Sequence, residues 1–252
     1  MFRDITIGQY YPTGSVIHKL DPRVKLIATC LFIISIFTFK NLSGYIVAAA
    51  YLLIVIIVSK VPLRYILKGF RSVLILVIFT AVFNLYAAGV ISALFFVIRI
   101  IFIIMGSSLL TYTTTPKQLT DGIEKLFGPL NKIKVPVHEF ALIMSLALRF
   151  IPILVEETDK IIKAQTSRGA NYDEGGLIVK AKSVISLLIP LLASAMRRAG
   201  DLALAMDARC YNGGEGRTKM KPLMYVKRDY VAYAVVLLYL ILLFALGRYV
   251  NL

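Results

Sequence analysis

The chain has 252 residues, of which 58% are hydrophobic, and its mean hydropathy is +0.77. A soluble domain needs more polar residues than this for its surface, so the composition indicates an integral membrane protein and excludes an ordinary soluble enzyme. The net charge of +15 is typical of membrane proteins, which collect lysine and arginine on their cytoplasmic side, and we expect no nucleic-acid partner.

The first 23 residues are rich in charge and contain no apolar core, so we expect no cleavable signal peptide there. Asp21 is predicted to cap the first apolar segment, and Pro22 suits its first turn. The two cysteines, Cys30 and Cys210, stand alone in unlike surroundings, which argues against a disulfide framework and against a metal site.

The fold class predicted from the apolar segments is all-α, with four N-terminal transmembrane helices and a final C-terminal one. The segments run over residues 24–39, 45–59, 72–88, 90–110 and 230–247. The loop at 60–71 carries four basic residues and no acid, whereas the turn "AAGV" at 87–90 carries no charge. By the positive-inside rule, the N-terminus and the 111–229 region are cytoplasmic and the C-terminal tail is outside. We therefore expect three parts: 1–110, 111–229 and 230–252.

The apolar segments carry almost no ionisable groups, and no acidic residue lies between Asp21 and Asp121. Ion-coupled carriers and proton pumps usually keep acids within their spans, so both classes are disfavoured. Arg99 is the intramembrane charge. One interpretation is that Arg99 has a function. The other, which we favour because the spans contain no acid to pair with it, is that Arg99 bonds to helix carbonyls or lies at a helix–helix seam.

The 111–229 region begins with a short helix, which Pro116 is expected to open and Gly128-Pro129 to end. Two long helices are predicted next, over about 137–167 and 177–208. Each changes from an apolar half to a polar half. The apolar halves either lie against the membrane surface, which we favour, or form two further spans or a re-entrant hairpin.

Proline lies inside both long helices, at Pro152 and Pro190, and should kink them. In the polar half of the first helix, the spacing predicts ion pairs between Glu156 and Lys160 and between Asp159 and Lys163.

Both long helices are expected to end in similar sequences, Ser167-Arg168-Gly169 and Ala208-Arg209-Cys210. An arginine at a helix C-terminus can simply complement the helix dipole, which is the favoured interpretation from the residues alone. Alternatively, small neighbours leave each guanidinium free to enter a groove on a partner and form bidentate bonds there. Two such tips would fit a partner with two similar pockets.

The leader "SVIHKLDPRVKL" (15–26) resembles that of the transmembrane T components of energy-coupling factor transporters, the CbiQ/EcfT-like subunits. The matching positions are Ser15, His18, Leu20, Asp21, Pro22, Arg23 and Lys25. The two arginine motifs are similar to the two Ala-Arg-Gly-like motifs of that family, with Ser167 and Cys210 in place of the usual alanine and glycine.

The resemblance implies a prokaryotic plasma-membrane subunit of a vitamin or metal-ion importer. In that family, the two arginine motifs dock into two ATP-binding cassette subunits, and the T component also holds a membrane-embedded, substrate-binding S component. From the apolar halves of the two long helices, residues 140–155 and 184–196, we expect the S-component surface to lie there. Met144, Leu146 and Leu188 are the expected examples of S-component contacts. ATP and Mg²⁺ would be bound by the partner subunits, and this chain would bind no cofactor or metal.

Other classes of membrane protein are less well supported by the residues. His18 and His138 are isolated, and the P-loop pattern G-x-x-x-x-G-K-[ST] is absent, so the sequence offers no catalytic residue. A secondary transporter, or a membrane scaffold without ATPase partners, is the alternative interpretation.

Overall fold

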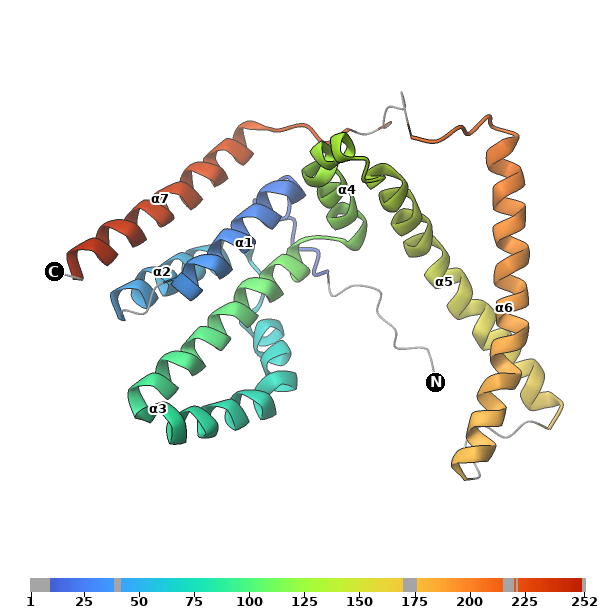
Figure 1. The fold of residues 1–252 in the computed structure, drawn as a ribbon, viewed down its shortest axis with the longest axis horizontal. Helices are drawn as coiled ribbons and strands as arrows, with labels where there is room; N and C mark the ends of the chain where they lie inside the picture. The colour runs from blue at the N-terminus through green and yellow to red at the C-terminus, as the bar shows by residue number, and fades with distance from the viewer. Residues whose placement is uncertain (1–9, 39–41, 170–175, 215–219, 221, 251–252) are drawn as a thin grey trace. The chain divides into compact units, whose positions relative to one another are not determined.

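The computed structural model describes residues 10–38, 42–169, 176–214, 220 and 222–250, and these residues form helices and loops without a strand (Figure 1). This confirms the predicted all-α class. The elements are α1 (Pro22–Thr38), α2 (Leu42–Ser59), α3 (Leu63–Thr113), α4 (Pro116–Phe127), the 3₁₀ helix η1 (Gly128–Ile133), α5 (Val137–Ser167), α6 (Leu177–Asp207) and α7 (Lys227–Val250).

Three of the described helical stretches are long and apolar enough to cross a membrane: Gly89–Thr113, Val137–Ser167 and Lys227–Leu246. Ser43–Ser59 and Val73–Ala87 are shorter apolar helices. Several apolar helices of this kind are what a multi-pass membrane protein requires.

The third and fourth predicted segments form one element, α3, which is interrupted at Gly89 with φ of 83° and ψ of 172°. Figure 1 shows α3 turning back on itself at this break. The expected loop at 60–71 is mostly helical: Pro62 lies directly before the first turn of α3, and the helix continues through Gly69. Basic residues do not interrupt a helix, so the charge pattern of this segment did not distinguish a loop from a helix, and its cytoplasmic position stays a prediction.

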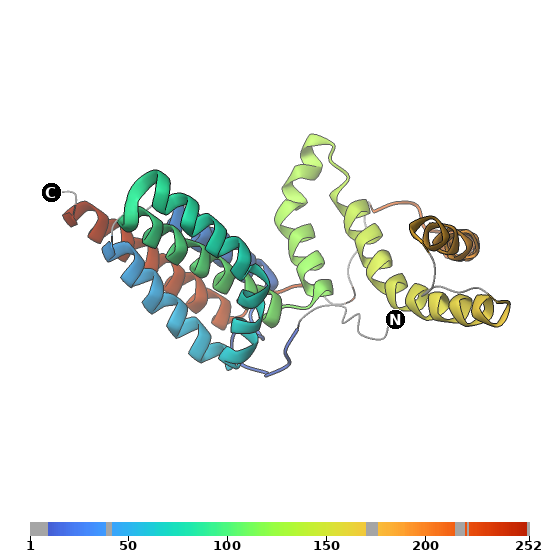
Figure 2. The same ribbon diagram turned by 90° about the horizontal axis from the view of Figure 1, so that it is seen from below.

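The chain divides into two compact units, which are described separately. Among the described residues, one unit lies within residues 10–127 and 222–250, and the other lies within residues 128–220. In the first unit, α1, α2, α3 and α7 form a bundle, which Figure 2 shows from below. Its core contains Phe32, Ile36, Tyr45, Ala48, Leu52, Ile56, Val61, Ile66, Leu109, Tyr112, Tyr239 and Leu243.

Two glycines let α3 and α4 approach α1 closely. A Cβ atom on Gly106 of α3 would lie 2.9 Å from the ring of Phe32, and one on Gly122 of α4 would lie 3.1 Å from Pro22. Small residues at such seams allow the backbones to pack tightly, which matters where lipid offers no hydrophobic driving force between helices.

The short helix α4 begins with a reciprocal capping box. The backbone N–H of Gln118 donates to the Thr115 hydroxyl at 3.3 Å, and the N–H of Thr115 donates to the Gln118 side-chain oxygen at 3.1 Å. These two bonds satisfy donors that a helix start leaves without partners. The predicted opening at Pro116 and end at Gly128 are confirmed.

The second unit contains the two long helices, each of 31 residues, which span about 46 Å apiece at 1.5 Å per residue. Their bounds, Val137–Ser167 and Leu177–Asp207, confirm the predicted helices to within one residue. Pro152 and Pro190 lie inside them, as expected, and the kinks themselves stay a prediction.

Candidate functional site

The first arginine tip is the C-terminal cap of α5. Arg168 has φ of −89° and ψ of 7°, and Gly169 directly after it has φ of 90°, in the left-handed region that favours glycine. The N–H groups of Arg168 and Gly169 donate to the carbonyls of Gln165 and Thr166, both at 3.0 Å. The Ser167 hydroxyl donates to the Lys163 carbonyl at 3.0 Å, so its hydrogen bond is made within the helix and not with the Arg168 guanidinium.

The second tip repeats this geometry at the end of α6. The N–H of Cys210 donates to the Asp207 carbonyl at 2.9 Å, and the N–H of Tyr211 donates to the Met206 carbonyl at 3.0 Å. These are the two bonds of a Schellman cap, in which a left-handed residue follows the last helical turn. That residue is Cys210, which has φ of 55° although it is not glycine.

Arg168 and Arg209 therefore hold the same place, directly before the left-handed residue of a helix cap. Both side chains are exposed, and neither forms an ion pair within the described residues. Ala208, next to Arg209, is also exposed. The favoured dipole interpretation and the docking interpretation both fit this position, but an unpaired exposed guanidinium on a fixed cap is what docking needs.

The second tip is followed by a strap, residues 211–214, that returns to the start of α5. Gly214 lies against the His138 ring, where an added Cβ would come within 2.7 Å of Cγ and 3.0 Å of Nε2. His138, for which the sequence suggested no function, thus packs against the strap that follows Arg209. Contacts of this kind carry no local sequence signal.

The two long helices are joined by a polar cluster where they pack together. Arg198 Nη2 donates to Glu157 Oε2 at 3.0 Å, and the buried Ser194 hydroxyl donates to Glu157 Oε1 at 3.3 Å. The predicted pairs Glu156–Lys160 and Asp159–Lys163 are wrong, because no ion pair joins them in the described part of the chain. The neighbouring acid, Glu157, instead bonds across to α6.

An apolar groove of about 330 Å³ lies between α5 and α6, lined by Leu146, Phe150, Leu154 and by α6 residues that include Ala195, Ala199 and Ala203. Of the expected S-component contacts, Met144 and Leu188 are each 51% exposed, whereas Leu146 is half-buried in this groove. Their contact role stays a prediction.

The leader forms a buried polar hub in the first unit. Nε2 of His18 donates to the Tyr11 carbonyl at 2.8 Å, and Nδ1 shares a hydrogen bond of 2.7 Å with the Ser15 hydroxyl. Burial lowers the pKa of His18, which favours the neutral ring, in which Nδ1 accepts the serine proton. Leu20 is half-buried beside this hub.

Asp21 and Arg23 join the leader to the last helix. Arg23 donates two bonds to the Asp21 carboxylate, at 3.0 and 2.8 Å, and its guanidinium lies 4.0 Å from the centre of the Tyr225 ring. Asp21 Oδ1 also accepts the N–H of Arg23 at 2.9 Å, which confirms the predicted cap of the first helix, with Pro22 at its first position. The Asp21 N–H donates to the buried carboxylate of Asp229.

Lys25 joins the same hub to α3. Its buried ammonium donates to the carbonyls of His18 (3.1 Å) and Thr113 (2.8 Å). Thr113 is the last residue of α3, so the lysine satisfies a carbonyl that the helix end leaves open and complements its dipole.

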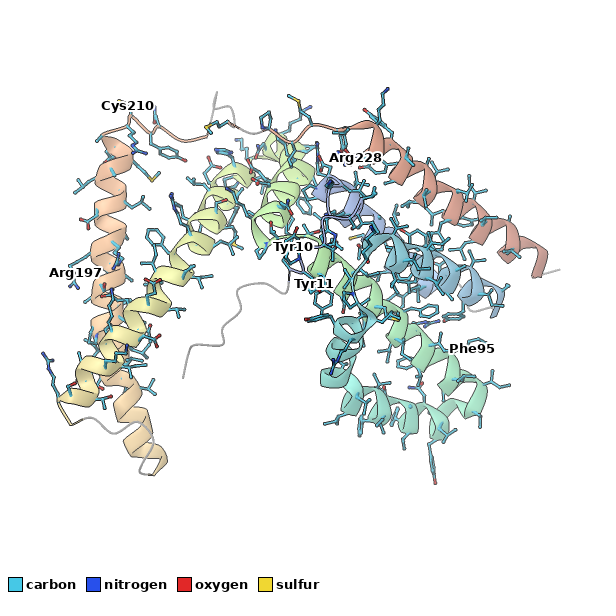
Figure 3. All side chains as sticks on the ribbon, turned by 180° about the vertical axis from the view of Figure 1, so that it is seen from behind. Tyr10, Tyr11, Phe95, Arg197, Cys210 and Arg228 are labelled. Atoms are coloured by element: carbon cyan, nitrogen blue, oxygen red, sulfur yellow. The ribbon has the colours of Figure 1, made fainter. Side chains whose placement is uncertain are left out.

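Arg99 lies at a helix–helix seam, as favoured. Its Nε donates to the Tyr45 hydroxyl on α2 at 3.2 Å, and its guanidinium lies 5.6 Å from the ring centre of Phe37 on α1. Figure 3 shows the neighbouring Phe95 on the same helix, whose ring stacks on Tyr45. A hydroxyl and aromatic faces replace the missing acid.

Within the described residues, no group of three or more His, Cys, Asp or Glu could hold a metal ion.

Comparison with known proteins decides the family. Residues 13–220 match the CbiQ family, described as cobalt transport protein. A protein of Clostridium kluyveri named energy-coupling factor transporter transmembrane protein EcfT is 50% identical over 92% of this chain and 93% of its own length. The chain belongs to the EcfT family.

Further EcfT proteins are similar over most of their lengths. The one from Ruminiclostridium cellulolyticum is 46% identical over 95% of this chain and 96% of its own, and the one from Bacillus subtilis is 41% identical over 91% and 93%. Membership of the EcfT family makes the chain a transmembrane component of an energy-coupling factor transporter, and it favours this interpretation over a secondary transporter or an unrelated scaffold.

Proposed function

We propose that this chain is the coupling subunit of a vitamin or metal-ion importer, and that it transmits movement from two ATP-binding cassette subunits to an S component. The observation that carries the proposal is the repeated cap: two exposed arginines, each directly before a left-handed residue, at the ends of two paired helices. The chain itself is non-catalytic in this proposal, and ATP and Mg²⁺ are bound by the partners.

Each tip docks one ATPase subunit. Arg168 and Arg209 insert their guanidinium groups into grooves that offer carboxylates or carbonyls, where bidentate bonds are strong and directional. The cap bonds fix the backbone below each guanidinium, so little order has to be gained on binding.

The helices behind the tips act as levers. The Glu157–Arg198 pair and Ser194 join α5 to α6, so a displacement of one tip is passed to the other helix. Pro152 and Pro190 supply bends in these levers. The apolar halves that contain Met144, Leu146 and Leu188 meet the S component.

Residues 1–110 hold the leader and four N-terminal spans, residues 111–229 form the coupling region, and residues 230–252 hold the last span. The N-terminus and the coupling region face the cytoplasm, and the C-terminus lies outside. The leader hub is structural in this arrangement, because Asp21, Arg23 and Lys25 bind the ends of three helices together.

A native cysteine tests the docking site. Cys210 is exposed directly beside Arg209, and Figure 3 shows it at the end of α6, whereas Cys30 is exposed on α1 and serves as an internal control. We expect bound ATPase subunits to slow maleimide labelling of Cys210 at least tenfold and to leave Cys30 labelling unchanged.

The same protection should disappear in Arg209→Glu, since the second ATPase subunit is then lost. Equal labelling of Cys210 with and without ATPase subunits would contradict docking at this tip.

A further inference from the structure

The bundle of the first unit contains an apolar groove of about 240 Å³ between the leader and the helices α1, α2, α3 and α7. Its walls are mostly apolar, although Lys25, Thr29 and Thr113 also belong to the lining. The aromatic part of the wall is ordered by ring contacts: the rings of Phe32 and Tyr51 lie 5.6 Å apart, and Tyr51 stacks on Tyr239 at 4.4 Å.

The groove is about one leaflet deep. Along α7 its lining runs from Arg228 to Val236, a rise of eight residue steps, or about 12 Å at 1.5 Å per residue. Half of a hydrocarbon core of about 30 Å is about 15 Å. An acyl chain also ends at the membrane centre, whereas a partner helix would need a groove that continues through both leaflets.

One residue of the lining is an exposed cation. This residue is Arg228, which Figure 3 shows at the start of α7. The neighbouring acids have other hydrogen-bond partners: Asp229 is buried and accepts two backbone N–H groups, and Asp21 pairs with Arg23. Arg228 forms no ion pair with any described residue.

We propose that this groove binds one anionic phospholipid, with an acyl chain between α1, α2 and α7 and the phosphate against Arg228. With the topology proposed above, the lipid belongs to the cytoplasmic leaflet. Binding requires no ATPase subunit, so it is tested independently of the arginine tips.

The test uses the purified, delipidated chain in detergent and native mass spectrometry, with phosphatidylglycerol or phosphatidylcholine of identical acyl chains. We expect one tightly bound phosphatidylglycerol and weaker binding of phosphatidylcholine. Arg228→Gln should weaken phosphatidylglycerol binding about fivefold, the effect of one basic residue at a membrane surface, and bring it close to phosphatidylcholine.

Matched variants separate this site from general effects. Ala232→Phe fills the groove and should abolish the tight binding, whereas Ala234→Phe, on the exposed face of the same helix, should not. Arg64→Gln removes an exposed cation that does not line the groove and should leave binding unchanged.

Equal affinity for the two lipids, or unchanged phosphatidylglycerol binding in both Arg228→Gln and Ala232→Phe, would overturn the proposal. A crosslink from Val235→Cys to the S component in the assembled transporter would also overturn it, because the groove would then hold protein.

Discussion

The buried carboxylate of Asp229, at the start of α7, accepts a hydrogen bond of 2.8 Å from the backbone N–H of Asp21, 208 residues earlier in the chain. Its other oxygen accepts the N–H of Val226 at 2.7 Å. One side chain thus holds the first turn of the last helix and the first turn of α1.

Replacing this carboxylate should destabilise the bundle. Asp229→Ala leaves two N–H groups without partners, at about 1–3 kcal/mol for each one that stays buried, so we expect a clear fall in melting temperature. Asp201→Ala, an exposed acid of α6, is the matched control and should change little. Equal melting temperatures for both variants would show that the hub does not stabilise the fold.

The left-handed backbone at Cys210 predicts that a substitution there increases the stability of the α6 cap. Cys210→Gly should stabilise the cap of α6 by about 1 kcal/mol, because glycine adopts φ of 55° without the Cβ penalty. Ala208→Gly, where φ is −60°, should instead destabilise it by about 1 kcal/mol. Hydrogen exchange of the amides of residues 208–211 measures both changes, and a loss of protection in Cys210→Gly would contradict the cap geometry.

The strap after the second tip depends on Gly214. Gly214→Ala should displace the strap from His138 and increase proteolysis near residue 214, because the added Cβ meets the ring. In a His138→Ala background the same substitution should have almost no effect. Gly200→Ala, where a Cβ meets nothing within 4 Å, is the control. Rapid proteolysis of Gly214→Ala in both backgrounds would exclude this contact as the cause.

Stability should fall on acidification because of His18. Burial lowers its pKa in the folded chain, so below the unfolded value of about 6.5 the unfolded chain binds more protons and gains in stability relative to the folded one. We expect the melting temperature to decrease as the pH falls from about 7 towards 5, and to decrease less in His18→Asn. Parallel pH profiles for the two chains would contradict this assignment.

The topology predicts that the break in α3 faces outside. Tyr86 is 96% exposed three residues before Gly89, so a cysteine there is accessible. In a Cys30→Ala, Cys210→Ala background, Tyr86→Cys should react with an impermeant thiol reagent in intact cells. Reaction only after lysis would invert the proposed orientation.

Local sequence signals predicted most of the helices. The two long helical patterns placed α5 and α6 to within one residue, and Gly169 marked the end of α5. The segment 63–71 was missed because basic residues in a membrane protein suggest a loop, although nothing in them breaks a helix.

The long-range contacts could not be predicted in this way. Nothing near Glu157 shows that it bonds to Arg198 rather than to a residue one turn away, and nothing near Asp229 points to Asp21. The acid in the first turn of α7 did offer a signal, since a lone carboxylate at a helix start is a frequent cap. The leader residues were found through a resemblance, and the structure supplies their physical role.

Counting ATPase subunits on charge-reversed tips tests the central claim most directly. The transporter is purified through this chain, and the ATPase subunits per chain are measured for the wild type, Arg168→Glu, Arg209→Glu and the double variant. Arg197→Glu, an exposed arginine on the shaft of α6, is the control (Figure 3). We predict two subunits for the wild type and the control, one for each single variant and none for the double variant; two subunits on the double variant would contradict the account.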